Sequence, residues 1–378
     1  MNMSSSTYKS YNGSVIFSVL LHALVVSCIS RHNVVGRGLD EGGRAGYKPS
    51  SIFVFGDSTS DPGNNNFVRT AFRSNFPPYG HDFPNQVATG RFTNGRLVSD
   101  FVAEHIGVKK YVPPYLDPKL TIEDLKTGVS FASAASGFDP LTPLLISGVI
   151  SLPRQLEYFE EYRTKMEAAI GKNETDALVK NALYMISAGT NDFVVNYFTF
   201  PIRRKTYDVP SYIDFVLQHI HHFMQGLMEM GARRIGFAGL GPIGCLPGVI
   251  TLHPNNGFLK RGCIEPISAA ARDFNTKLEI ELKTLQSNSS FQGSRIAVLD
   301  VYTTADDIVR NQKFGFEEVT SGCCGTGIIE TSMLCNSMTP LCSNTSKYYF
   351  FDAIHPTEKA YGITSLAIQP TIDYLIKD

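Results

Sequence analysis

The sequence predicts an α/β fold in which a central parallel sheet of about five strands carries helices on both faces. Short apolar runs bounded by glycine or polar residues alternate along the chain with longer segments whose apolar residues recur at helical spacing. Alternation of this kind joins parallel strands through right-handed crossovers, which place helices on both sides of the sheet. The short runs are compactly apolar, as strands that are buried on both faces should be.

Five strands are expected, with amphipathic helices between them. The strands lie at Ser51–Phe55, in a segment that starts at Gly128, at Asn181–Gly189, at Ala232–Leu240 and at Ser294–Val301. Helical stripes contain Leu156, Phe159, Met166 and Ile170, then Ile213 to Met230 with Gly231 as the stop, then Ala270, Phe274, Leu278, Leu282 and Leu285. No repeat, low-complexity tract or linker interrupts this series, so residues 48–378 are expected to form one domain.

The bulk composition excludes some classes of function. The chain has 378 residues, with 34 Lys and Arg against 35 Asp and Glu. A balanced charge offers no basic excess to neutralise phosphates, so nucleic acid is not an expected partner, and neither is an anionic membrane surface. The length is sufficient for one large α/β domain.

The first 30 residues have the pattern of a signal peptide. Lys9 is the only basic residue before the apolar run from Val15 to Cys28, which is short for a transmembrane helix of about 20 residues. A membrane anchor is the alternative interpretation. Residues 31–47 are rich in glycine and charge and are expected to form a flexible leader. The protein is therefore predicted to be secreted and extracellular, with no membrane segment after the signal is removed.

The cysteines fit an oxidising compartment. Cys28 falls in the signal, and six others remain, which allow 15 pairings. Local loop closure favours Cys245 with Cys263, and it favours the Cys323–Cys324 doublet with Cys335 and Cys342. A zinc site is the alternative, but the Cys-x-x-Cys spacing is absent. The sequons at Asn173, Asn288 and Asn344 are candidates for glycosylation.

Reactive groups follow several of the expected strands. The first strand runs into Gly56-Asp57-Ser58, the second into Ser136-Gly137 and the third into Gly189-Thr190-Asn191-Asp192. In an open parallel sheet, ligands bind beyond the carboxyl ends of the strands. Ser58 is therefore either part of a simple turn or a nucleophile, and a nucleophile needs a base, an orienting acid and donors for an oxyanion.

His355 is the best candidate for the base. Asp352 lies three residues before it, and two residues three apart on one helical turn face the same way. Asp352 could then hold the imidazole Nδ1–H and leave Nε2 free for Ser58. The alternative is a helix N-cap with an incidental histidine. Among the other histidines, His219 and His222 share a helix face and could form a metal pair, but no carboxylate is spaced beside them as a third ligand.

Three other patterns have simpler explanations. The glycines from Gly239 to Gly244 match G-x-G-x-x-G, but a dinucleotide site needs the first βα turn and a helix that opens there. Pro242 favours a loop instead. Asp57 is expected to bond the turn backbone, and Asp192 is expected to brace its loop.

Taken together, these motifs resemble the plant GDSL-type esterase/lipase family of the SGNH hydrolase superfamily. The resemblance rests on "VFGDSTSDPGNNN", "GTND", "DAIHPT", "GARRIGFAGLGPIGCLPG" and "GCCGTG" and runs from about Ser51 to Lys377. It implies a flavodoxin-like three-layer α/β/α fold and ester hydrolysis without metal or cofactor. It also implies Ser58 as nucleophile, His355 as base, Asp352 as the orienting acid, and an oxyanion hole from Ser58, Gly137 and Asn191.

The sequence departs from the family pattern at three places. Thr59 replaces the usual leucine, Ala134-Ala135 replace a glycine pair, and Phe351 stands where tryptophan is common. These changes remove no catalytic group and are expected to affect the range of substrates. The predicted function is a secreted serine hydrolase that cleaves carboxylic esters, of lipid type, through an acyl-serine intermediate. The alternatives are an extracellular acyltransferase that uses the same residues, and a non-catalytic coat protein that binds lipid or glycan.

Overall fold

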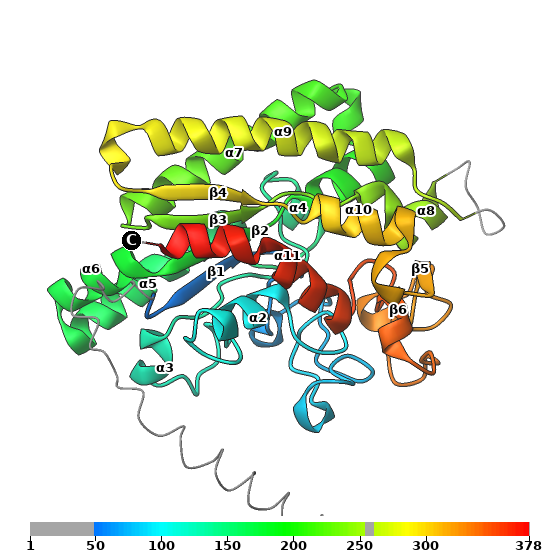
Figure 1. Ribbon diagram of the computed structural model, residues 1–378, viewed down its shortest axis with the longest axis horizontal. Coiled ribbons are helices and arrows are strands. Elements are labelled where there is room, and N and C mark those ends of the chain that lie inside the picture. The colour runs from blue at the N-terminus through cyan, green and yellow to red at the C-terminus, as the bar shows by residue number, and fades with distance from the viewer. Residues whose placement is uncertain (1–48, 254–260, 378) are drawn as a thin grey trace, which may run out of the picture. The chain divides into compact units, whose positions relative to one another are not determined.

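The computed structural model describes residues 49–253 and 261–377, in which four parallel strands form the central sheet (Figure 1). These strands are β1 (Ile52–Gly56), β2 (Leu183–Ser187), β3 (Arg234–Ala238) and β4 (Arg295–Leu299). They are hydrogen-bonded in the order β1-β2-β3-β4, each parallel to its neighbour. Three of them lie inside predicted strands and β1 ends one residue beyond its predicted strand, so the α/β class with a parallel sheet is confirmed.

The segment after Gly128 was expected to be a regular strand, and that expectation is wrong. Ser130 forms only isolated parallel bridges, to Val54 on one side and to Pro114 on the other. The backbone of this segment bonds β1 through Val129 and Phe131, and the Asn64 side-chain amide donates to the carbonyls of Ser130 and Ala132, 2.8 Å to each oxygen. The segment still lies beside β1, where the second strand of a flavodoxin-like sheet would lie.

Helices cover both faces of the sheet, and the alternation along the strands decides which residues meet which helices. Phe53 and Phe55 of β1 pack in one core cluster with α5 (Leu152–Ile170), α7 (Val209–Glu229) and α9 (Glu265–Ser287). Ile52 and Val54 pack in a second cluster with α2 (Val98–His105) and α11 (Glu358–Ile376). Figure 1 shows α11 crossing the sheet on the face opposite to α7 and α9. The helices α5, α7 and α9 contain the three stripes that the sequence predicts.

Side-chain caps fix the starts of three of these helices. Ser151 accepts a hydrogen bond from the Arg154 N–H at the start of α5, and Asp208 does the same for Ser211 at the start of α7. Thr357 accepts from the Ala360 N–H and begins α11 directly after the segment with His355. Such caps satisfy backbone donors that the first helical turn leaves open. The position of α11 is therefore set from its first residue.

Smaller elements complete the described chain. The short helices are α3 (Ile122–Lys126), α4 (Thr142–Leu145), α6 (Lys172–Asn181), α8 (Pro247–Leu252) and α10 (Tyr302–Asn311). A second, two-stranded parallel sheet joins β5 (Glu318–Gly322) to β6 (Tyr348–Phe350). This small sheet was not predicted, because its strands are short and carry several polar residues.

Three disulfides lie in the described residues. Cys245 bonds Cys263, while Cys323 bonds Cys342 and Cys324 bonds Cys335. The pairing that local loop closure favours is confirmed, including separate partners for the two adjacent cysteines. The three sequon asparagines, Asn173, Asn288 and Asn344, are exposed.

Residues Tyr47–Asp378 form one compact unit. The expected signal peptide and leader lie outside the described residues. Within 49–253 and 261–377, the structure contains no helix that is both long enough and apolar enough to cross a membrane.

Candidate active site

Ser58 lies where the chain leaves the sheet at the end of β1. Gly56 has φ 140°, and a Cβ there would lie 2.0 Å from the Ser187 carbonyl oxygen, so only glycine fits at this point. The buried side chain of Gln155 in α5 bonds both backbone groups of Gly56, at 2.9 Å each. The sheet therefore ends at a fixed point, and Ser58 follows two residues later with 8% of its surface exposed.

Ser58, His355 and Asp352 form one hydrogen-bonded line. The Ser58 Oγ lies 2.7 Å from His355 Nε2, and His355 Nδ1 lies 2.8 Å from Asp352 Oδ2. Ser58 and His355 are 297 residues apart in the sequence. All three side chains are buried. The geometry permits His355 to accept the Ser58 proton while Asp352 holds the other ring nitrogen.

The sequence analysis expects Asp352 and His355 on one helical turn, and this expectation is wrong. They lie in the bend between β6 and α11, where Asp352 Oδ1 accepts from the backbone N–H groups of Ile354 and His355 at 2.8 and 2.7 Å. Asx turns of this kind close on their own backbone. The same carboxylate thus shapes the bend and bonds the ring, and the N-cap of α11 is Thr357 rather than Asp352.

Two residues that the sequence reasoning missed hold Asp352 from the other side. The Tyr79 hydroxyl donates to Asp352 Oδ2 at 2.7 Å, and the Thr331 hydroxyl donates to the same oxygen at 3.0 Å. Burial opposes the charge on Asp352, yet its pKa lies below the usual value because His355, Tyr79 and the turn backbone favour the ionised form. Asp352 is therefore a carboxylate next to His355. Tyr79 follows a pair of prolines in an otherwise unremarkable segment, so no motif of its own marked it.

Asn191 lines the same cavity as Ser58, and Gly137 does not. One amide hydrogen of Asn191 bonds the Ser136 carbonyl at 2.9 Å, which leaves the second amide hydrogen available. Gly137 lines a neighbouring cavity. Among the described residues no group accepts the backbone N–H of Gly137 or of Ser58. The structure therefore brings Asn191 and Ser58 together as expected, and it sets Gly137 in the adjoining loop.

Asp192 braces that loop. It accepts hydrogen bonds from the backbone of Phe138 and Asp139, at 2.8 and 3.1 Å, and from the Thr142 hydroxyl. Burial raises the pKa of Asp192 to about 7, against the effect of these donors. A Cβ at Gly137 would lie 2.1 Å from Asp192 Oδ1, so this loop passes too close for any side chain there. The expected bracing role fits this arrangement.

The alanine pair lies in a tightly held turn. Asp61 accepts from the backbone of Gly63, Asn64 and Ala134, at 2.8, 2.6 and 2.9 Å, and burial raises its pKa to about 6. The next residue, Ala135, has φ 67°, a left-handed conformation that costs a non-glycine residue about 1–2 kcal/mol. The family pattern has glycine at this pair, so this chain carries strain that glycine would avoid.

Thr59 ties the serine turn to the next strand. Its hydroxyl lies 2.9 Å from Asp57 Oδ1 and 2.8 Å from the Ser187 hydroxyl at the end of β2. Its backbone N–H also donates to Asp57 Oδ1, as expected for an acid that bonds its own turn. Burial raises the pKa of Asp57 to about 6. The usual leucine would keep the backbone contact but has no hydroxyl for the other two.

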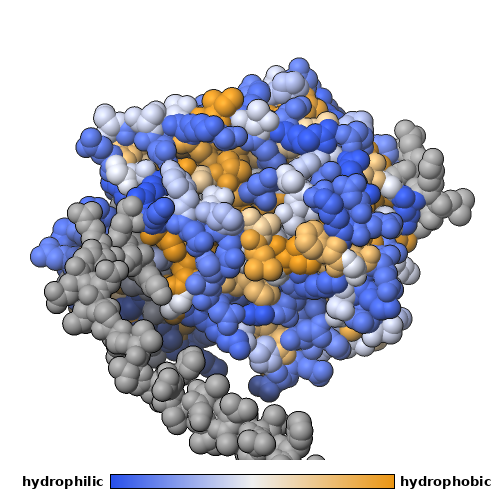
Figure 2. Space-filling model, viewed as in Figure 1, coloured by the Kyte–Doolittle hydropathy of each residue, from blue (hydrophilic) through white to orange (hydrophobic). Residues whose placement is uncertain are grey.

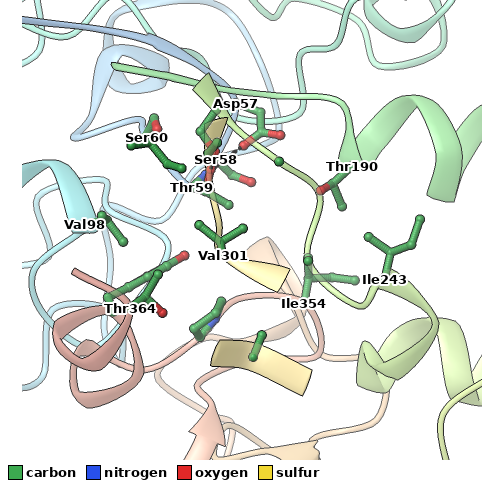
Figure 3. A pocket seen from close by; sticks show the side chains of 18 of the residues that line it. Asp57, Ser58, Thr59, Ser60, Val98, Thr190, Ile243, Val301, Ile354 and Thr364 are labelled. Atoms are coloured by element: carbon green, nitrogen blue, oxygen red, sulfur yellow. Dashed lines mark hydrogen bonds between the residues drawn. The ribbon is translucent and has the colours of Figure 1, made fainter. Parts of the chain in front are cut away.

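A cavity of about 150 Å³ opens at Ser58 (Figure 3). Polar groups from the end of β1 lie at its upper side, where Figure 3 shows Asp57, Ser58, Thr59 and Ser60. The rest of its wall is mostly apolar. It includes Val98, Met185, Ile186, Ala238, Ile243, Leu246, Leu299, Val301, Ala305, Phe350, Ile354 and Ile368. An apolar cavity with a few convergent polar groups is the usual form of a small-molecule site.

The remaining candidates lie elsewhere. His219 and His222 line the neighbouring cavity, and His221 bonds Glu281 at 2.6 Å. In the part of the chain that the structure describes, no group of three or more His, Cys, Asp or Glu side chains could hold a metal ion. The G-x-G-x-x-G run leads from β3 into a short 3₁₀ turn at Ile243–Cys245 rather than into a long helix.

Comparison with known proteins defines the class. Residues 52–368 match the family model described as GDSL-like Lipase/Acylhydrolase. The chain is 53% identical over 328 residues to GDSL esterase/lipase At5g45960 of Arabidopsis thaliana, which covers 86% of this chain and 87% of that protein. It is 46% identical over 314 residues to GDSL esterase/lipase At5g42170 of the same plant, with 82% and 83% covered.

The chain therefore belongs to the plant GDSL esterase/lipase family. The resemblance that the motifs suggest is confirmed over nearly the whole described chain. Membership makes the protein a carboxylic ester hydrolase, a class that acts on small-molecule substrates.

Proposed function

We propose that this protein is a secreted esterase that cleaves lipid-type acyl esters through an acyl-serine intermediate on Ser58. The observation that carries the proposal is the hydrogen-bonded line from Ser58 Oγ through His355 to Asp352, with distances of 2.7 and 2.8 Å. A serine hydroxyl is a weak nucleophile unless an adjacent base takes its proton. Here the base, His355, lies within hydrogen-bond distance of Ser58, and the ionised, buried carboxylate of Asp352 holds His355 in place.

The reaction follows from these contacts in two halves. His355 Nε2 removes the proton from Ser58 Oγ as this oxygen attacks the ester carbonyl carbon. His355 then gives the proton to the alcohol oxygen as the ester bond breaks, and the acyl group remains on Ser58. In the second half His355 activates a water molecule, which attacks the acyl carbon and releases the acid. Asp352 remains ionised and stabilises the imidazolium in both halves.

The carbonyl oxygen becomes an anion in each half and needs hydrogen-bond donors. We assign the backbone N–H groups of Ser58 and Gly137 and the side-chain amide of Asn191 to this role. The free amide hydrogen of Asn191 and its place on the Ser58 cavity support the assignment. The backbone N–H groups of Ser58 and Gly137 also support it, because no group among the described residues accepts a hydrogen bond from either. One such donor is worth roughly 3 kcal/mol in the transition state.

Secretion is proposed on three grounds. The N-terminal sequence has the pattern of a signal peptide. The three disulfides are of a kind that persists in oxidising compartments. The sequon asparagines are exposed, so an oligosaccharide could be attached to them without unfolding the chain. Expression of the full chain in plant cells, with detection of the protein in the apoplastic fluid, tests this part.

A fluorophosphonate probe tests the mechanism. The probe phosphonylates an activated serine, so the wild-type protein should be labelled once, and the Ser58→Ala variant should not be labelled. Ser60→Ala is a matched control, because Ser60 lies in the same turn and lines the same cavity. Absence of labelling in a folded wild-type protein, or labelling that persists in Ser58→Ala, would overturn the proposal.

A further inference from the structure

Part of the Ser58 cavity extends into the protein interior beneath α11. This part, named the α11 arm, is lined by Val98, Met185, Leu299, Thr364 and Ile368. Met185, Leu299 and Ile368 belong to the core cluster that packs α11 and α2 against the sheet. Protein interiors are normally close-packed, with few voids larger than a water molecule. A cavity that opens at Ser58 and continues into this core is therefore a feature to be explained.

The wall of the α11 arm offers little to water. Four of these five residues are apolar, and the fifth, Thr364, donates its hydroxyl hydrogen to the Ala360 carbonyl at 3.0 Å. Ser99 and Tyr361 also line the Ser58 cavity, and the buried Tyr361 hydroxyl has no hydrogen-bond partner among the described residues. Near the mouth, the Thr59 and Ser187 hydroxyls bond each other. The whole Ser58 cavity, of which the α11 arm is a part, measures about 150 Å³. Cavities with apolar walls bind apolar molecules rather than water. The chemistry of the α11 arm therefore matches an aliphatic chain.

The two sides of the cavity differ, and Figure 3 shows both. Val98 and Thr364 lie on one side, Thr190 and Ile243 lie on the other, and Val301 lies between them below Ser58. The acyl group stays bound to Ser58 through both halves of the reaction, whereas the alcohol must leave after the first. A closed interior arm suits the part that is retained, and the side of Thr190 and Ile243 suits the part that leaves.

We propose that the α11 arm receives the unbranched aliphatic acyl chain of the substrate, and that Val98 and Thr364 limit its length. The inference rests on the proposed function, because it needs an acyl group on Ser58. Val98 is the first residue of α2 and Thr364 lies on α11, so the width of the arm depends on how these two helices pack. Both are specificity-determining residues rather than catalytic ones.

The test uses Thr364→Leu, with Thr364→Val as the matched control. Valine keeps the shape of threonine and removes only a hydroxyl that bonds its own helix, whereas leucine adds volume that would fill the arm. One assay series varies the acyl part in nitrophenyl acetate, butyrate, octanoate and palmitate. The other varies the alcohol part in ethyl, butyl and octyl acetates.

We expect Thr364→Leu to lower kcat/KM for octanoate, relative to acetate, by at least about tenfold, which corresponds to 1.4 kcal/mol. Thr364→Val should keep the wild-type ratio, and the alkyl acetate series should not change in either variant. Val98→Leu should also lower kcat/KM for octanoate relative to acetate, and this variant tests the inference if Thr364→Leu does not fold. An unchanged octanoate-to-acetate ratio in a folded leucine variant would overturn the inference, as would a shift confined to the alcohol series.

The outcomes also separate this inference from the proposed function. If the proposed function fails, the wild-type protein hydrolyses no ester and takes up no fluorophosphonate at Ser58. If only the inference fails, acetate hydrolysis and labelling persist in every variant, and the acyl-length profiles of the wild-type protein and both leucine variants coincide.

Discussion

The two sides of the Ser58 site are built differently. On the histidine side, Ser58, His355, Asp352 and Tyr79 are joined by hydrogen bonds of 2.7 to 2.8 Å. On the Asn191 side, the donors are held in place but still have hydrogen atoms to offer. The histidine side is complete without a substrate, whereas in the proposed mechanism the Asn191 side gains its last partner when a carbonyl oxygen becomes an anion. This difference is what preorganised electrostatic catalysis requires.

The carboxylic acids follow the same division. On the histidine side, the pKa of Asp352 lies below its usual value, because the donors around it outweigh its burial. In the loops on the other side, burial raises the pKa of Asp61 to about 6 and that of Asp192 to about 7. The first acid serves as a charge in the reaction. The other two serve as hydrogen-bond acceptors that shape loops.

Loss of the base should give the largest effect. We predict that His355→Ala lowers kcat by about 10⁴-fold or more, and that Asp352→Asn lowers it by about 10⁴-fold because the ring loses its orienting charge. KM should change little. Steady-state kinetics on nitrophenyl butyrate measure both, with His81→Ala at an exposed position as the control. Activity within tenfold of wild type in His355→Ala would show that His355 is not the catalytic base.

Loss of the Asn191 amide should be smaller. We predict that Asn191→Ala lowers kcat by about 10² to 10³-fold, since one oxyanion donor is removed and the nucleophile is kept. Fluorophosphonate should still label Ser58, more slowly than in the wild type. Asn311→Ala removes an exposed amide at the end of α10, outside the residues that line the Ser58 cavity, and should leave kcat unchanged. Equal kcat in Asn191→Ala and the wild type would remove Asn191 from the oxyanion hole.

The raised pKa values predict how stability depends on pH. An acid with a raised pKa binds more protons in the folded than in the unfolded state between its ordinary value and the raised one. Stability therefore falls as pH rises through that window. For Asp192 the window runs from 3.8 to about 7. We predict that the free energy of unfolding rises as pH is lowered from 7 to 5.

Urea unfolding at pH 5, 6 and 7 measures this slope. Asp192→Asn removes the titrating group and keeps the shape, so its slope should be shallower than that of the wild type. Asp124→Asn is the control. Bonds to Thr121 lower the pKa of Asp124, so this carboxylate does not titrate in this pH range. Identical slopes in Asp192→Asn and the wild type would show that Asp192 is ionised throughout.

Release of strain at Ala135 should give the smallest effect. Glycine tolerates the positive φ of 67°, so we predict that Ala135→Gly raises the free energy of unfolding by up to about 1 kcal/mol. Ala134→Gly, at a neighbour without positive φ, should lower it. The midpoints of urea denaturation compare the two variants. A loss of stability in Ala135→Gly would show that packing of the methyl group outweighs the backbone strain.

The sequence predicts the three residues of the hydrogen-bonded line, but it does not predict the residues that hold them in place. Ser58, Asp352 and His355 could be found because each lies in a short motif beside an expected strand or helix. Tyr79, Thr331 and Gln155 could not be found, since a phenol, a hydroxyl or an amide has no local signature, and each acts through contacts with residues 21 to 273 positions away. Long-range partners of this kind are decided by the folded packing.

The same reason explains the errors in the fold. Four of the five predicted strands are present, because continuous apolar runs identify strands that are buried on both faces. The segment after Gly128 has the composition of a strand and bonds β1, but it forms only isolated bridges at Ser130, and a side chain more than 60 residues earlier, Asn64, bonds two of its carbonyls. Asp352 and His355 were placed on a helix because the spacing of three suits one, whereas the carboxylate closes a turn on its own backbone.

The central claim is that the acyl group of the substrate passes through Ser58. Rapid quenching of the enzyme with nitrophenyl octanoate, followed by mass spectrometry of the digested chain, tests this claim most directly. We predict a burst of about one nitrophenolate per active site and an octanoyl group on the peptide that contains Ser58, with neither in Ser58→Ala. Octanoyl transfer to another residue, or turnover by Ser58→Ala at the wild-type rate, would contradict the claim.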